Sequence, residues 1–168
     1  INGNGSANFN TFLFGFFIFF LVQSAVEEIM MRSFLIPLLE VRLGIWVSLI
    51  LSASVFSVIH IFNPNFSVIG SINIFLGGLA LGLLFIQYRS FWLVTGFHAA
   101  WNFIQASFFD FNVSGHNVYS FVQFEVLIPD WFSGGDFGFE GSIVSIILLF
   151  VAVVWLFRNM NYNLNRYR

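Results

Sequence analysis

Residues 12–32 read FLFGFFIFFLVQSAVEEIMMR. The first half, residues 12–22, is an unbroken apolar run, and the second half carries two glutamates and an arginine. A transmembrane helix needs about 20 mostly apolar residues, so this stretch predicts a membrane span that contains ionisable side chains. An ionised side chain at the bilayer centre costs at least about 2.5–3.5 kcal/mol on insertion scales. Such groups therefore pair with one another, face a cavity or take part in chemistry.

The composition of the whole chain agrees with a membrane protein. Of its 168 residues, 58% are hydrophobic, 21% are aromatic and 8% are charged, and the mean hydropathy is +0.87. Soluble domains carry about 25% charged residues, and disordered chains combine low hydrophobicity with high charge, so both classes are excluded. The lack of cysteine excludes disulfides and thiol nucleophiles. Six basic residues and a net charge of −2 make nucleic-acid binding unexpected.

Four further apolar stretches follow the first, and Asn63-Pro64 marks the end of the second because proline disfavours helix continuation. We predict an all-α, polytopic transmembrane bundle of about five helices, over residues 11–39, 44–62, 68–88, 91–109 and 142–157. Segment 110–141 is expected to form a structured external or re-entrant loop. Gly78 and Gly82 are expected to let another helix approach closely. We expect one domain over residues 1–168, with its core in 11–157.

The arginines predict the orientation of the bundle. Threading five spans alternately places all six on one side of the membrane: Arg32, Arg42, Arg89, Arg158, Arg166 and Arg168. The other side receives segment 110–141, which is acidic and contains no basic residue. Because cytoplasmic loops are enriched in Lys and Arg, we expect the carboxyl end to be cytoplasmic. The expected location, which the charge distribution does not indicate, is a bacterial cytoplasmic membrane.

The three charged side chains of the first span are predicted to have different roles. Glu28 and Arg32 are four residues apart with the acid on the amino-terminal side, which is the favourable order for a helical ion pair. Glu27 is turned about 100° away around the helix and cannot share that pair equally. We therefore assign Glu28 and Arg32 a supporting structural role. Glu27, as an acid without a partner in an apolar setting, is the candidate for proton exchange.

Polar side chains also interrupt two later spans. His98 and Asn102, one helical turn apart, lie on a polar stripe of the fourth span, so they face the bundle interior or a wet cavity. Hydrogen bonding between helices would explain that stripe as well as catalysis does. His60 closes the second span, and the short connection to the first makes the two helices antiparallel neighbours, which lets His60 face Glu27. His116, in segment 110–141, is given no role.

The order of these residues resembles that of the CPBP family, the CAAX prenyl endopeptidases and bacteriocin-processing membrane proteases, also called the Abi family. Its motifs Glu-Glu-x-x-x-Arg, Phe-x-x-x-His and His-x-x-x-Asn are matched by Glu27, Glu28 and Arg32, by Phe56 and His60, and by His98 and Asn102. Residues 133–142 also look like the family's stretch before its last helix. The resemblance covers residues 11–157. Because members often carry extra amino-terminal helices, and the sequence begins with Ile1, we expect helices upstream.

The resemblance implies intramembrane proteolysis of membrane-associated substrates, such as prenylated CAAX-type tails or bacteriocin precursors. By that analogy Glu27 is the general base and His60 holds and polarises the attacking water, while His98 and Asn102 stabilise the oxyanion. The expected partners are membrane lipid and a peptide or lipidated-protein substrate.

The resemblance leaves two views of metal dependence, because the family is widely labelled as metalloendopeptidases. This sequence has no His-Glu-x-x-His pair, and a zinc site would need three ligands gathered from separate helices. We therefore expect no metal site and no cofactor. A zinc ion held by two histidines and Glu27 is the less favoured alternative.

Two other classes of protein stay open. A catalytically inactive immunity or scaffold protein would keep the same fold, and a proton-coupled transporter would use Glu27 and the histidines as a relay. Other membrane proteases fit less well. Ser114-Gly115 lacks the preceding glycine of a rhomboid-type Gly-x-Ser-Gly, and Gly134-Gly135-Asp136 is not the Gly-x-Gly-Asp of presenilin-type proteases.

Overall fold

The computed structural model describes residues 4–118, 120 and 128–164, and these form an all-α bundle. Its long helices are α1 (Asn4–Glu28), α2 (Ile36–Leu43), α3 (Ile45–Ile59), α4 (Val68–Tyr88), α5 (Phe91–Phe109) and α7 (Ile143–Leu164). Short elements complete it: the π-helix η1 (Ile29–Leu35), the 3-10 turns η2 (His60–Phe62), η3 (Gly135–Phe137) and η4 (Phe139–Gly141), and the single turn α6 (Asp130–Ser133). The predicted fold class is confirmed.

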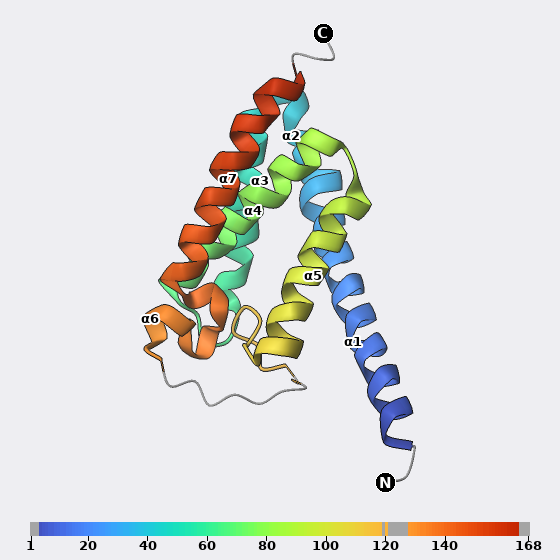
Figure 1. Ribbon diagram of the computed structural model, residues 1–168. Coiled ribbons are helices and arrows are strands. Elements are labelled where there is room, and N and C mark those ends of the chain that lie inside the picture. The colour runs from blue at the N-terminus through green and yellow to red at the C-terminus, as the bar shows by residue number, and fades with distance from the viewer. Residues whose placement is uncertain (1–3, 119, 121–127, 165–168) are drawn as a thin grey trace.

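The helices form two groups that diverge toward the end of the molecule where the amino terminus lies (Figure 1). One group contains α1 and α5, which pack side by side, and the other contains α3, α4 and α7. Each group has its own apolar core, around Phe20 and Ala99 in the first and around Leu83 and Leu156 in the second. A third apolar cluster, around Met31 and Phe56, lies where the groups meet.

Four helical stretches in the described part of the chain are long and apolar enough to cross a membrane: Leu13–Leu43, Ile45–Phe62, Val68–Tyr88 and Ile143–Met160. They correspond to four of the five predicted spans. The remaining predicted span, 91–109, forms α5 with the expected bounds. Helix α5 falls outside the set because its polar residues lower its hydropathy, and these side chains, including Thr95 and Gln105, are buried inside the bundle.

The first span differs most from its prediction. It runs without interruption to Leu43 instead of ending near Leu39, and it changes to π-helical geometry immediately after Glu28. Pro37 at the start of α2 supplies no N–H to the preceding turn. Within η1 the carbonyl of Met31 accepts from the backbone N–H of Ile36 and also from Ser52 Oγ at 3.0 Å. Single π-helical turns are rare and often lie at functional sites.

Segment 110–141 is structured in its described parts, as predicted. The backbone N–H of Gly115 donates to the carbonyl of Phe137 at 2.9 Å. The Asn63 side chain donates to the carbonyl of Ser114 at 2.9 Å, which ties this segment to the turn after α3. Residues 119 and 121–127 lie outside the described part of the chain, as do Arg166 and Arg168 of the orientation argument.

The packing role predicted for Gly78 and Gly82 is confirmed. A Cβ atom on Gly78 would lie 3.1 Å from the Cα atom of Ala53 in α3, and one on Gly82 would collide with the side chain of Leu49. The absence of a side chain at both positions therefore lets α4 lie directly against α3.

Replacing Gly78 by valine should destabilise the bundle, because the new side chain meets the backbone of α3. Overpacked interiors typically lose about 1–3 kcal/mol, which should appear as a lower unfolding midpoint in detergent micelles. Gly15→Val is the matched control, since Gly15 is also on a membrane helix and a Cβ there meets nothing within 4 Å. Equal midpoints for the two variants would contradict the close-approach interpretation.

Candidate active site

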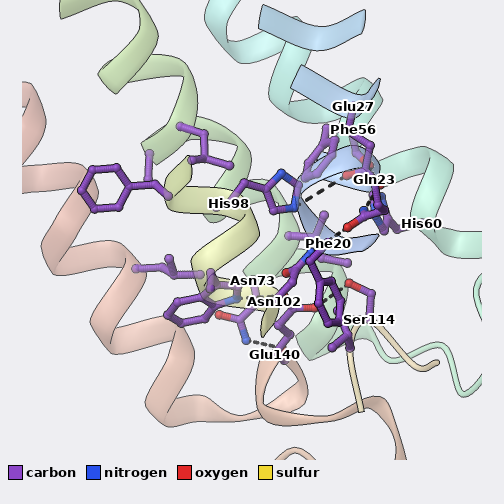
Figure 2. Close-up of a pocket in the computed structure, with 18 of the residues that line it drawn as sticks. Phe20, Gln23, Glu27, Phe56, His60, Asn73, His98, Asn102, Ser114 and Glu140 are labelled. Carbon is purple, nitrogen blue, oxygen red and sulfur yellow. Dashed lines mark hydrogen bonds and ion pairs between the residues drawn. The ribbon is translucent and has the colours of Figure 1, made fainter. Parts of the chain in front are cut away.

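A cavity of about 740 Å³ lies between the two helix groups, and most of its wall is apolar (Figure 2). Its lining includes all four residues that the sequence proposes for catalysis: Glu27, His60, His98 and Asn102. They come from α1, from η2 at the end of α3, and from α5. The structure therefore brings the four side chains to one cavity, as the sequence predicts.

The predicted ion pair between Glu28 and Arg32 forms behind the cavity wall. Arg32 Nη1 lies 3.1 Å from Glu28 Oε1, and the two side chains are 1% and 0% exposed. The guanidinium also donates to the carbonyl of Gly78 at 3.2 Å and lies 4.7 Å from the ring centroid of Phe56. Arg32, which the sequence counts among the arginines of one side of the membrane, turns its side chain inward to this carboxylate.

His98 connects both glutamates of the first motif. Its Nδ1 atom lies 2.8 Å from Glu28 Oε1, and its Nε2 atom lies 3.7 Å from Glu27 Oε2. A carboxylate at Nδ1 fixes the tautomer and the orientation of an imidazole ring. Glu28 therefore orients His98 as well as pairing with Arg32. No local pattern predicts this contact, because the two residues are 70 positions apart on different helices.

Gln23 links the remaining catalytic candidates and was missed in the sequence. Its amide donates to Glu27 Oε1, and its Oε1 atom accepts from Asn102 Nδ2 at 3.0 Å. The expectation that Glu27 has no partner is therefore wrong. A signal was present, because Gln23 and Glu27 are four residues apart and share one face of α1. The second carboxylate oxygen of Glu27 is buried and makes no hydrogen bond within the described residues.

His60 packs against the ring of Phe56, one helical turn earlier in the chain. Its Nδ1 atom lies 2.6 Å from the carbonyl of Phe56, and the two ring centroids are 4.7 Å apart. The ring of Phe56 also lies 6.0 Å from that of His98. With Nδ1 bound to the backbone, the Nε2 atom of His60 is left for a group in the cavity.

A third carboxylate, Glu140 of η4, also lines the cavity and was not predicted as a site residue. It is 8% exposed. Its Oε1 atom accepts from Trp101 Nε1 at 3.0 Å and from Gln105 Nε2 at 3.2 Å, and its Oε2 atom accepts from Ser114 Oγ at 2.6 Å. His116, for which no role is predicted, lines the cavity too.

The ligand set for a metal is incomplete in the described part of the chain. No group of three His, Asp or Glu side chains there is arranged to hold a metal ion. His98 and His60 use their Nδ1 atoms within the protein, toward Glu28 and the Phe56 carbonyl, which leaves only their Nε2 atoms for a ligand. A catalytic zinc needs three protein ligands, and these side chains do not fit that requirement.

Comparison with known families gives a match over the first part of the chain. A family described as type II CAAX prenyl endopeptidase Rce1-like matches residues 9–104, more than half of the chain. The matched range contains the four candidate catalytic residues together with Glu28 and Arg32, and it ends before Glu140. No curated protein and no solved structure matches the chain significantly.

Replacing Arg32 by leucine should strongly destabilise the protein, because it leaves a buried carboxylate without its cation. Breaking a buried ion pair in this way costs about 3–5 kcal/mol, measurable as a fall in the unfolding midpoint in micelles. The double variant Glu28→Gln/Arg32→Leu should recover part of the loss, since no buried charge is then left unpaired.

The control for this comparison is Glu40→Gln, which removes the exposed pair between Glu40 and Arg89 at 3.5 Å. Exposed pairs contribute about 0–1 kcal/mol. If Arg32→Leu cost no more than this control, the ion pair would not be what holds α1, η1 and α4 together.

Proposed function

The chain belongs to the Rce1-like family of type II CAAX prenyl endopeptidases, and on that premise we propose that it hydrolyses peptide bonds of membrane-associated substrates. Its apolar helices and its family make it an integral membrane protein. The observation that carries the proposal is the convergence of Glu27, His60, His98 and Asn102 on one cavity inside the bundle.

In the proposed reaction Glu27 and His60 hold and activate a water molecule. The Oε2 atom of Glu27, which makes no hydrogen bond among the described residues, accepts a hydrogen bond from the water. Since His60 donates its Nδ1–H to the Phe56 carbonyl, its Nε2 atom can accept the second hydrogen bond of the same water. Glu27 takes the proton as the water oxygen bonds to the substrate carbonyl carbon. When the C–N bond breaks, Glu27 returns the proton to the departing amine.

His98 and Asn102 are the proposed donors to the oxyanion of the tetrahedral intermediate. The Asn102 amide has two N–H groups, of which one donates to Gln23 and the other is available. His98 donates Nδ1–H to Glu28, so a proton on Nε2 would complete an imidazolium that is oriented by one carboxylate and close to a second. Each fixed donor at an oxyanion lowers the free energy of the transition state by about 2.7–4 kcal/mol.

The shape of the cavity supports an apolar or lipidated peptide as the substrate. Away from Glu27 it continues between α4 and α7, where its wall includes Leu81, Leu84 and Ala152. Phe97 and Trp155 also line it and are 57% and 62% exposed. The cavity therefore reaches the apolar surface of the bundle, and an alkyl or prenyl chain can enter from the bilayer.

We also propose that the carboxyl end of the bundle is cytoplasmic. The ends of α2, α4 and α7, which carry Arg42, Arg89 and Arg158, lie at the same end of the molecule (Figure 1). The described parts of segment 110–141 lie at the other end. This distribution follows the enrichment of cytoplasmic loops in Lys and Arg.

The variants Glu27→Gln, His60→Ala and His98→Ala should each abolish cleavage of a quenched lipidated peptide in detergent or liposomes, while the protein still inserts and folds. His98→Ala should also lose some thermal stability, because it removes one of the two partners of the buried Glu28. Asn102→Ala should lower kcat by about 10²–10³, the usual effect of losing one oxyanion donor. His116→Ala is the matched control, because His116 lines the same cavity and has no proposed role. Full biological activity in all three abolishing variants would favour an inactive immunity or scaffold protein.

Cleavage should be unaffected by a strong chelator, because the proposed water is activated by Glu27 and His60 alone. The measurement is the initial rate before and after prolonged incubation with the chelator, with a zinc peptidase in the same detergent as a positive control for metal removal. Loss of activity that returns when zinc is added back would contradict the metal-free mechanism.

A further inference from the structure

The end of the cavity opposite Glu27 is built around the Glu140 carboxylate (Figure 2). Every side chain that donates to this carboxylate is neutral: the indole of Trp101, the amide of Gln105 and the hydroxyl of Ser114. No salt bridge in the described part of the chain involves Glu140. By contrast, the buried Glu28 has Arg32 as its cation. Glu140 is therefore a buried acid without a counter-charge.

The groups around Glu140 also leave acceptors unused. Asn73 is 1% exposed and lines the cavity. Its amide N–H groups donate to the backbone carbonyls of Glu140, at 2.5 Å, and of Ser142, at 3.0 Å. Its Oδ1 atom has no hydrogen-bond partner among the described residues, and neither has the Oε1 atom of Gln105. A buried acceptor without a partner costs about 1–3 kcal/mol, so a ligand that donates hydrogen bonds is favoured here.

Apart from its histidines, the lining of the cavity carries charge of one sign. Glu27 and Glu140 line it, whereas no lysine or arginine among the described residues does so. Clefts lined by one sign of charge, with walls of low dielectric constant, concentrate ligands of the opposite charge. The ligand that fits the Glu140 end is therefore a cation with several N–H donors.

The distance from the proposed catalytic donors fits a side chain of the same substrate. Trp101 and Gln105, which hold the Glu140 carboxylate, are each three positions beyond His98 and Asn102 on α5. Three positions are about 4.5 Å along a helix, and an extended peptide advances about 3.3 Å per residue. A peptide whose carbonyl lies at His98 and Asn102 therefore reaches this end of the cavity within about one or two residues.

We propose that Glu140 and Asn73 form a subsite for a lysine or arginine side chain of the peptide substrate, one or two residues from the bond that is cleaved. This inference rests on the proposed peptidase function. It makes Glu140, which lies beyond the residues matched by the family, a determinant of sequence specificity. The competing explanation is that Glu140 only ties η4 to α5.

The first test compares peptides and needs no variant. The assay measures cleavage of quenched lipidated peptides by the wild-type protein in liposomes. The peptides differ only by lysine, norleucine or glutamate, placed in turn at each of the two positions on either side of the scissile bond. At one of these positions lysine should lower KM at least tenfold relative to norleucine, and glutamate should raise it. Equal KM values for the three peptides at every position would overturn the proposal.

The second test assigns the preference to Glu140. Glu140→Gln removes the charge and keeps an oxygen acceptor for Trp101, so the lysine preference should fall to within about twofold while cleavage of the norleucine peptide persists. Asp136→Asn is the control, because Asp136 is an exposed acid of the same loop, and it should leave the preference intact. Equal slowing of all three peptides by Glu140→Gln would mean a structural role only and would overturn the proposal.

Direct binding separates failure of the subsite from failure of the peptidase function. The anisotropy of fluorescently labelled lysine and norleucine peptides is measured on Glu27→Gln protein, with and without Glu140→Gln. Tighter binding of the lysine peptide that depends on Glu140 would support the subsite even if the wild-type protein cleaved neither peptide. Cleavage of all peptides with no difference in binding would retain the peptidase and overturn the subsite.

Discussion

The burial of the Glu28 carboxylate is the constraint on which the arrangement of the helices depends. The side chain is fully buried, and a buried charge is tolerated only when it is paired and hydrogen-bonded. Arg32 and His98 meet this requirement at 3.1 and 2.8 Å. Because Arg32 also donates to the Gly78 carbonyl, one carboxylate fixes η1, α4 and α5 relative to one another. The two helix groups can therefore diverge elsewhere and enclose a cavity without losing their register at the site.

Neighbouring acids acquire different chemistry from their surroundings. Glu28 has a guanidinium and an imidazole as partners, so its charge is compensated and it acts on the reaction only through His98. Glu27, one residue earlier, faces the cavity, contacts the neutral Gln23 and keeps one oxygen free. The change to π-helical geometry begins directly after this pair, at the point where one helix must direct adjacent side chains to a structural pair and to a cavity. Proton transfer is therefore proposed for Glu27, because the protein compensates its charge less than that of Glu28.

Sequence reasoning predicted the features that depend on local pattern. Hydropathy gave the bounds of α4 and α5, spacing gave the Glu28–Arg32 pair, and the close approach at Gly78 followed from small residues one turn apart. It failed where contacts join distant segments: nothing near Glu28 in the sequence indicates His98, and nothing near Glu140 indicates Trp101 or Gln105. The π-helical turn was missed because it depends on Pro37 together with a hydroxyl donated by Ser52 of another helix. Gln23 is the exception, since its spacing from Glu27 was visible and was not used.

The rule that explains Glu28 also explains why the opposite end of the cavity points to a ligand. In a medium of low dielectric constant an acid is stabilised by a cation, by hydrogen bonds or by loss of its charge. Glu28 has the first two, whereas Glu140 has hydrogen bonds from neutral groups alone. Asn73 adds an unused acceptor beside it, and no lysine or arginine among the described residues lines the cavity to supply the missing cation. A cation supplied by the substrate satisfies both residues at once, and it couples occupancy of the outer end of the cavity to the placement of the scissile bond at His98 and Asn102.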